Sequence, residues 1–100
     1  MANQIKWSIK AEDTFAGIIA YLERKFTQRE VTNFVDRVYD KIELLRLLPR
    51  IGVSNNKKKN TYRTLIHKKV VLVYHYKPLK KEIVLITFWN TLQDPKRLKY

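Results

Sequence analysis

The residues of this chain that could do chemistry are mainly cations, and they crowd into its second half. Residues 1–56 hold nine Lys and Arg against seven Asp and Glu, whereas residues 57–100 hold twelve against two. Of the net charge of +12, +10 therefore belongs to the second part. Such asymmetry favours a polyanionic partner, either nucleic acid or an acidic protein segment. The alternative interpretation is a generally basic, solvated surface.

Aromatic side chains are interleaved with these cations. Lys and Arg neutralise phosphates and exposed rings stack on unpaired bases, so a sheet that carries both can bind single-stranded RNA. Lys57–Lys59 are explained equally well by a solvated loop, and for Tyr74 and Tyr76 packing in the core is favoured over stacking. The residues expected to contact a target or nucleic acid are Lys57, Lys58, Lys59, Arg63, Lys68, Lys69, Trp89, Lys96 and Arg97.

Other kinds of catalytic or metal site lack their residues. The chain has no Cys, which excludes disulfides, thiolate ligands and a Cys nucleophile. His67 and His75 are the only histidines, and their spacing is typical of ordinary strand residues rather than of a metal site. Two serines without an elbow motif do not support a Ser-His-Asp site, and two glycines cannot form a phosphate loop. We expect no metal and no cofactor.

The first half of the chain reads as one strand and two helices. Alternating apolar residues over 4–10 predict a strand, and apolar residues at helical spacing predict a helix over 11–25. The stretch TQRE resembles a capping box, in which the Thr27 side chain would cap a second helix. That helix should end near Leu48, because Pro49 pushes the preceding residue out of the helical region. A link this short predicts an antiparallel helical hairpin.

The second half reads as a loop over 50–60 and three strands, over 61–67, 69–76 and 82–89. The whole chain, residues 1–100, is expected to form a single α+β domain of order β-α-α-β-β-β. In it the helical hairpin packs on one face of a four-stranded, mainly antiparallel sheet. The first residues lack a signal-peptide pattern and no apolar run reaches about 20 residues, so we expect a cytoplasmic protein with no membrane partner.

This order of elements resembles the RelE/ParE superfamily of toxins from bacterial type II toxin–antitoxin modules. The resemblance covers the whole chain and consists of LLPRIG after the second helix, then YRTLI, VLVYHY and IVLITFW in successive strands, then DP. It implies that an antitoxin peptide wraps the protein and holds it inactive. RelE-like members cleave mRNA on the ribosome with basic residues and a Tyr on the sheet, whereas ParE-like members bind DNA gyrase.

The motifs of this chain are more similar to the ParE-like side. In the ribonucleases an Arg precedes the LVY motif, and here that position is Val71. Another Arg follows their last strand, and the matching stretch FWNTLQDP has none before Arg97. If the chain cleaves RNA through other residues, the candidates for catalysis are Arg63, Lys68, Arg97 and Tyr100.

Three functions are therefore compatible with the sequence. The first is a ParE-like toxin that binds a macromolecular target such as DNA gyrase and is neutralised by a cognate acidic antitoxin in a toxin–antitoxin hetero-oligomer. The second is a metal-independent, ribosome-dependent mRNA endonuclease, and the third is a basic nucleic-acid-binding domain without toxicity. An acidic amphipathic antitoxin peptide is expected in an apolar groove between the helices and the sheet, attracted by the charge of the second half.

Overall fold

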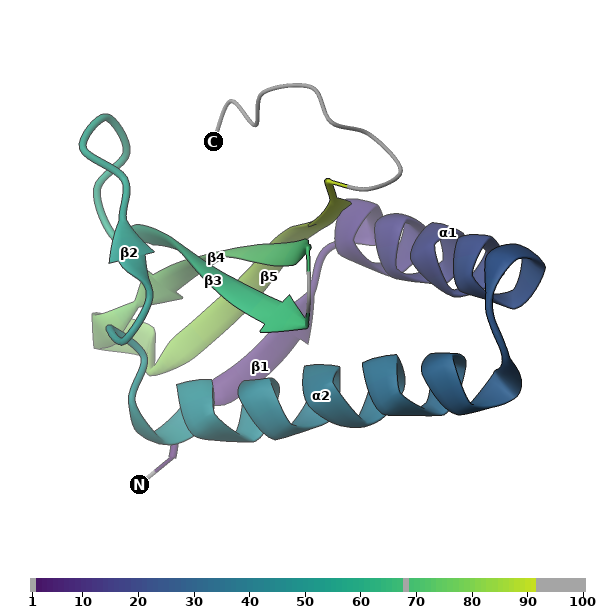
Figure 1. The fold of residues 1–100 in the computed structure, drawn as a ribbon. Coiled ribbons are helices and arrows are strands. Elements are labelled where there is room, and N and C mark those ends of the chain that lie inside the picture. The colour runs from purple at the N-terminus through teal and green to yellow at the C-terminus, as the bar shows by residue number, and fades with distance from the viewer. Residues whose placement is uncertain (1, 68, 92–100) are drawn as a thin grey trace.

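Two helices lie on one face of a five-stranded mixed sheet in the computed structural model, which describes residues 2–67 and 69–91 (Figure 1). In chain order the elements are β1 (Gln4–Trp7), α1 (Ile9–Lys25), α2 (Gln28–Leu47), β2 (Val53–Ser54), β3 (Thr61–His67), β4 (Val70–Lys77), the 3₁₀ turn η1 (Pro78–Lys80) and β5 (Glu82–Asn90). The strands are arranged β1-β5-β4-β3-β2. Strand β1 runs parallel to β5, and the other pairs are antiparallel.

The predicted α+β class and the order of its main elements are confirmed, but the predicted strand count was one too low. The added strand is β2, which pairs with β3 inside the segment expected to be a loop. With two exposed residues it is too short to carry a periodic apolar pattern.

The start of α1 lies two residues earlier than predicted. The Ser8 hydroxyl accepts a hydrogen bond from the Ala11 N–H at 3.0 Å, so it caps the helix. The strand expected over 4–10 consequently ends at Trp7, and Ile9 turns into solvent. The predicted capping box of α2 was wrong. Thr27 is the N-cap residue, but its side chain makes no capping hydrogen bond. Its carbonyl instead accepts from the backbone amides of the first turn.

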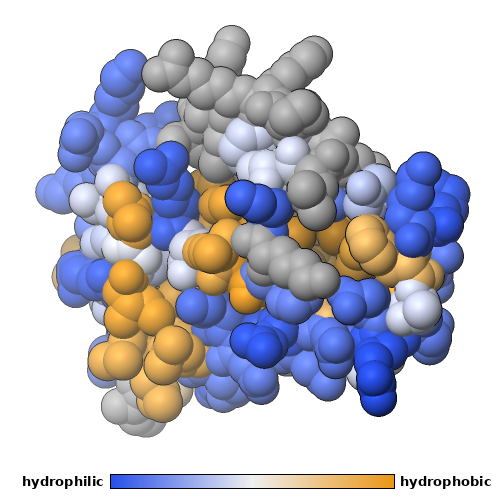
Figure 2. Space-filling view, viewed as in Figure 1, coloured by the Kyte–Doolittle hydropathy of each residue, from blue (hydrophilic) through white to orange (hydrophobic). Residues whose placement is uncertain are grey.

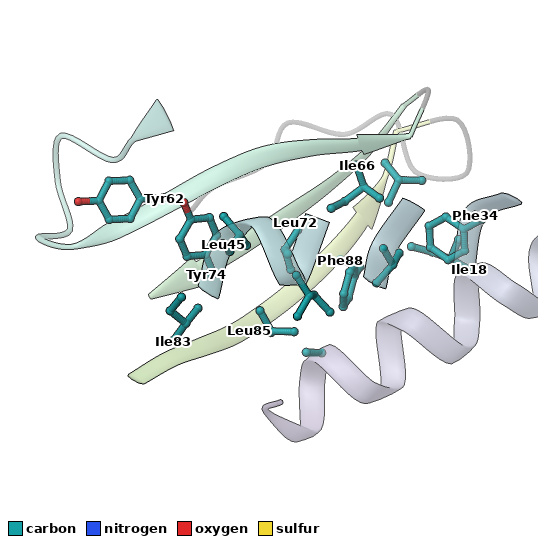
Figure 3. Close-up of a cluster of buried hydrophobic side chains, with 14 of the residues drawn as sticks. Ile18, Phe34, Leu45, Tyr62, Ile66, Leu72, Tyr74, Ile83, Leu85 and Phe88 are labelled. Atoms are coloured by element: carbon teal, nitrogen blue, oxygen red, sulfur yellow. The ribbon is translucent and has the colours of Figure 1, made fainter. Parts of the chain in front are cut away.

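The core lies between the helices and the sheet. Helix α2 contributes the predicted stripe of apolar residues, spaced three or four apart, of which Phe34, Val38 and Leu45 are fully buried. Figure 3 shows Phe34 and Leu45 of α2 in the same buried cluster as Leu72 of β4 and Leu85 of β5. Each such side chain contributes about 1.5–3 kcal/mol relative to an exposed one. Tyr74 and Tyr76 belong to the same cluster, which confirms the prediction that they pack in the core.

A bulge in β5 fixes the position of α1. The register between β4 and β5 shifts next to Val73 and Tyr74, and β1 reaches no further than the position opposite Leu85. Beyond that position, α1 supplies the missing partners of β5. The Ser8 hydroxyl donates to the Ile86 carbonyl at 2.9 Å, and the Thr14 hydroxyl accepts from the Phe88 N–H at 2.9 Å. The helix therefore completes the hydrogen bonding of the strand that it covers.

The hydroxyl of Tyr74 ties the segment after α2 to the sheet. It donates to the Pro49 carbonyl at 2.8 Å and accepts from the Gly52 N–H at 3.1 Å. A Cβ atom on Gly52 would lie 2.8 Å from both the Arg63 carbonyl and the Tyr74 hydroxyl, so only glycine fits. Burial, opposed by the Gly52 hydrogen bond, raises the pKa of Tyr74 to about 12. These contacts start β2 alongside β3.

Candidate functional site

The sheet face turned away from the helices holds two of the predicted binding residues. Arg63 pairs directly with Val73, and Val71 pairs with both Leu65 and Trp89. Directly paired residues share a face, so all five point to the same side. Arg63 is exposed and Trp89 is half-buried. Strand β4 separates them by a distance on the order of 10 Å.

The middle of this face, where Val73 is fully buried, offers little for catalysis among the described residues. Val71 takes the place where the resemblance puts an Arg in the ribonucleases, and its cross-strand neighbours Leu65 and Trp89 are apolar. Arg63 lies diagonally from Val71 on this face, whereas Lys6 and Lys77 share the face at the end of β4, where both contact Glu82. A single guanidinium can neutralise a phosphate, but it does not supply the second cation or the base that RNA cleavage needs.

The predicted lysines do not form one cluster. Lys57–Lys59 precede β3 and Lys69 follows it, so the length of a seven-residue strand, about 20 Å, lies between them. The Asn55 side chain shapes the first group, because its oxygen accepts from the Lys57 N–H at 2.7 Å and from the Lys58 N–H at 3.3 Å. The predicted residues Lys68, Lys96, Arg97 and Tyr100 lie outside the described part of the chain.

A concave basic site lies where the β2–β3 loop meets the β4–β5 turn. Thr61 at the start of β3 pairs with His75 near the end of β4, so antiparallel pairing brings the two connections to one end of the sheet. The hollow has a volume of about 640 Å³. We call it the basic hollow, and it is lined by Arg50, Lys59, Asn60, His75, Tyr76, Lys77, Pro78, Leu79 and Lys80.

Local contacts hold the walls of the basic hollow in place. The Arg50 guanidinium lies over the Tyr76 ring, 4.9 Å from its centre. Asn60 closes its loop with φ of 59°, a left-handed conformation that Asn tolerates, and its carbonyl accepts from the Tyr76 N–H at 2.9 Å. The Thr61 hydroxyl lies 3.1 Å from Nδ1 of His75. Each wall is thus tied to β4.

Only part of the positive charge of the basic hollow is neutralised. Lys77 Nζ lies 3.7 Å from a carboxylate oxygen of Glu82, but that carboxylate also binds Lys6 Nζ at 3.0 Å. The hydrogen bond from Lys6, with the charges of Lys6, Lys77 and Lys80, lowers the pKa of Glu82 despite its burial. Within the described residues, Arg50, Lys59 and Lys80 form no ion pair.

Sequence reasoning placed only Lys59 of this hollow among the binding residues. Arg50, Lys77 and Lys80 were missed because Arg50 comes from the α2–β2 segment and the two lysines from the end of β4 and the turn after it. The available signal was the antiparallel meander itself, since it places the loop before its first strand and the turn after its second at the same end.

A second surface is apolar and surrounds the end of α2. We call it the apolar patch, made of Leu44, Leu47, Leu48, Ile51 and Val53. Leu47 is 70% exposed and Val53 61%. Figure 2 shows this hydrophobic area at the lower left, over the end of α2 and the segment that leads to β2. Strand β2 is the edge of the sheet that residues 2–67 and 69–91 form, so within this part of the chain its outer backbone groups have no strand partner.

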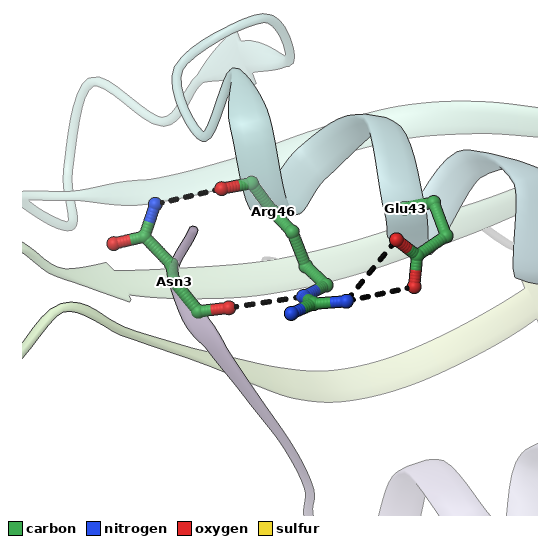
Figure 4. A network of polar contacts seen from close by, with 3 residues as sticks. All are labelled: Asn3, Glu43 and Arg46. Carbon is green, nitrogen blue, oxygen red and sulfur yellow. Dashed lines mark hydrogen bonds and ion pairs between the residues drawn. The ribbon is translucent and has the colours of Figure 1, made fainter. Parts of the chain in front are cut away.

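A polar network holds the end of α2 beneath this patch. Asn3 donates from its side chain to the Arg46 carbonyl at 3.0 Å, and Arg46 Nε donates to the Asn3 carbonyl at 3.2 Å (Figure 4). Arg46 also binds the Glu43 carboxylate. One hollow between the helices and the sheet, among the residues that the structure describes, measures about 30 Å³, which holds about one water.

Residues 2–67 and 69–91 contain no group of three or more His, Cys, Asp or Glu side chains that could hold a metal ion. None of the helices they form has the length and apolar character needed to cross a membrane.

Known proteins resemble this chain both in sequence pattern and in fold. The family model described as the ParE toxin of the type II toxin–antitoxin system parDE matches residues 5–95. A structure of the chromosomal ParDE system from P. aeruginosa is similar, with a TM-score of 0.71 and 13% identity over 89% of this chain and 96% of that one. The structure of a free RelE toxin mutant from E. coli has a TM-score of 0.66 and 16% identity, over 95% of this chain and 90% of that one.

The toxin–antitoxin complex RelBE2 from Mycobacterium tuberculosis gives a TM-score of 0.59 and 13% identity, over 90% of this chain and 99% of that one. Among curated protein sequences, none matches significantly. The structural likenesses show the fold, and the family model extends from β1 through β5. The chain is therefore a member of the ParE toxin family of type II toxin–antitoxin systems.

Proposed function

We propose that this toxin inhibits growth by binding a macromolecular target, as a ParE-like protein acting on DNA gyrase, rather than by cleaving RNA. The observation that supports this is the sheet face turned away from the helices, where Val71 lies between Leu65 and Trp89 in place of the Arg of the ribonucleases. A binding surface needs exposed and complementary side chains, whereas a nuclease needs cations and a base around one phosphate. The proposed toxin acts in the cytoplasm as a single domain.

We further propose that a cognate acidic antitoxin neutralises it in a hetero-oligomer. The apolar patch supports this, because contiguous exposed apolar residues mark protein-binding surfaces and this one adjoins the free edge of β2. An amphipathic segment could cover the patch and pair with that edge. The net charge of +12 would attract an acidic partner and speed association at low salt.

Induced expression of the full chain, alone and with the product of the neighbouring gene, tests the toxin function. We expect growth arrest without that product and rescue with it, with transcripts intact and gyrase supercoiling inhibited. Transcript cleavage that an Arg63→Ala variant abolishes would instead identify the mRNA endonuclease. Normal growth at good expression would leave the non-toxic, nucleic-acid-binding domain.

The antitoxin surface is tested with a Leu47→Glu, Val53→Glu double variant. Both side chains are more than half exposed, so the fold should tolerate the change. The variant should lose co-purification with the antitoxin and escape rescue while it still arrests growth. Ile9→Glu is the matched control, because Ile9 is 77% exposed but lies at the start of α1. Unchanged antitoxin binding by the double variant would refute this site.

A further inference from the structure

The basic hollow has the composition of an anion site. Arg50, Lys59, Lys77 and Lys80 surround it together with His75, and no acidic residue of the described chain lines it. It is an open surface depression of about 640 Å³. Exposed lysines on a convex surface repel one another weakly through water, but here cations from three connections converge on one concavity.

The charges of this hollow are incompletely compensated within the protein. Among residues 2–67 and 69–91, Glu82 is the one carboxylate in contact with a lining residue, and it is shared between Lys77 and Lys6. Arg50 is held by the Tyr76 ring, which leaves the hydrogen-bond donors of its guanidinium for another group. An anion that entered would therefore relieve repulsion and meet donors that are already positioned.

The hollow suits phosphate better than an acidic peptide. A peptide binds through apolar anchors and backbone pairing, and these features lie on the apolar patch and at β2. Among the described residues that line the hollow, the fully exposed Leu79 is the only large aliphatic side chain. Phosphates need cations and N–H donors, which Arg50, Lys59, Lys80 and the amide of Asn60 can offer.

We propose that the basic hollow binds nucleotide phosphates, presented either by the backbone of a nucleic acid or by a free nucleotide. Arg50 would take one phosphate through two N–H groups, and Lys59 and Lys80 would neutralise its neighbours. The residues that form it differ from those named for the proposed target face and for the apolar patch, although Arg50 is next to Ile51 of the patch, and His75 and Lys77 share a face of β4 with Val71. Its test uses DNA and ATP alone, so it does not depend on the proposed target or antitoxin.

The test compares the full-length chain with a Lys59→Gln, Lys80→Gln variant. Both lysines lack ion-pair partners within the described residues, so folding should persist, and thermal unfolding checks this. An Arg24→Gln, Lys25→Gln variant removes the same charge from the far end of the molecule, at the last turn of α1 (Figure 1). Binding to a fluorescent 20-base-pair DNA duplex is measured between 50 and 200 mM salt, and binding to ATP by calorimetry.

If the ligand is a nucleic-acid backbone, log affinity should decrease less steeply with log salt in the Lys59, Lys80 variant. The magnitude of the slope should be about 1.8 smaller, since each lost phosphate contact removes about 0.9. The ratio of the DNA affinity of the unaltered chain to that of the variant would then decrease about twelvefold over that salt range. For a free nucleotide, the variant should bind ATP at least tenfold more weakly. The control should change neither quantity.

Equal losses in the two variants would overturn the proposal, because net charge alone would then explain binding. So would binding of a poly-glutamate peptide that depends on Lys59 and Lys80 while DNA and ATP binding do not. Absence of any DNA or ATP binding by the unaltered chain would overturn it as well. Growth arrest is not part of this readout, so failure here is distinguishable from failure of the proposed toxin function.

Discussion

Replacing Tyr74 with Phe removes one hydroxyl and tests how the segment after α2 is held. The ring stays in the core, stacked on Tyr62 with a centroid separation of 5.4 Å, so packing changes little. Two hydrogen bonds are lost, those to the Pro49 carbonyl and from the Gly52 N–H. Both backbone partners are half-exposed, so water can replace part of the loss. The expected cost is about 1–2 kcal/mol of unfolding free energy.

The same hydroxyl predicts how this cost depends on pH. The pKa of Tyr74 is raised to about 12 in the folded protein from 10.0, so the unfolded chain loses this proton at a lower pH. The contribution is fully present below pH 10 and is lost as the pH rises towards 12. Two pH units correspond to at most about 2.7 kcal/mol. The Phe variant has no such proton, so its deficit should shrink above pH 10 and vanish near pH 11.

Urea unfolding at pH 8, 10 and 11 measures both effects. At pH 8 the midpoint should fall by about 1 M for a slope near 1.5 kcal/mol/M. Tyr39→Phe is the control, since Tyr39 is 52% exposed and should change little at any pH. Lysine titration affects every variant alike and cancels in the comparison. A Tyr74→Phe deficit that is absent at pH 8, or that stays constant up to pH 11, would refute the reasoning.

Three further changes test other parts of the fold. Gly52→Ala should lower the thermal midpoint by several degrees because its Cβ would meet a backbone carbonyl at 2.8 Å, and a circular dichroism melt equal to that of the unaltered chain would contradict this. Ser8→Ala should cost about 1–2 kcal/mol in urea unfolding, since it removes both the helix cap and the bond to the Ile86 carbonyl, whereas Ser54→Ala on β2 should be nearly neutral. The Glu82→Gln variant should lose less stability than the unaltered chain on acidification below pH 4.5. The reason is that the pKa of Glu82 is lowered in the folded protein, so its contribution to stability is present above that pH and is lost as the pH falls. A melting curve series in which both proteins lose stability equally in acid would argue against that role.

The relation between the two proposed surfaces bears on how such a toxin could be controlled. The apolar patch lies at the end of α2, and Arg50 of the basic hollow follows that end by three residues. An antitoxin that covers Leu47, Leu48 and Ile51 would therefore pass close to Arg50. Measuring duplex binding by the preformed complex would show whether the two sites exclude each other.

Local patterns determined much of the fold. The apolar stripe of α2 and the apolar run of β4 are periodic over many residues, so each element could be predicted without knowing its neighbours. The burial of Tyr74 and Tyr76 followed from the same run, since both share a face with Leu72. The family resemblance rested on the order of such elements, which is itself a property of the chain.

What the sequence could not specify depends on groups that meet only in three dimensions. Strand β2 exists because Tyr74 and Gly52 hold its segment against β3, and two residues carry no period of their own. The double role of Ser8 needs the bulge in β5, more than seventy positions away in the chain. The basic hollow likewise joins Arg50, Lys59 and Lys80, whose charges were visible in the sequence as separate runs. Side-chain periodicity is local and can be read along the chain, whereas convergence of charge is set by strand pairing, so only the tertiary structure decided where the cations gather.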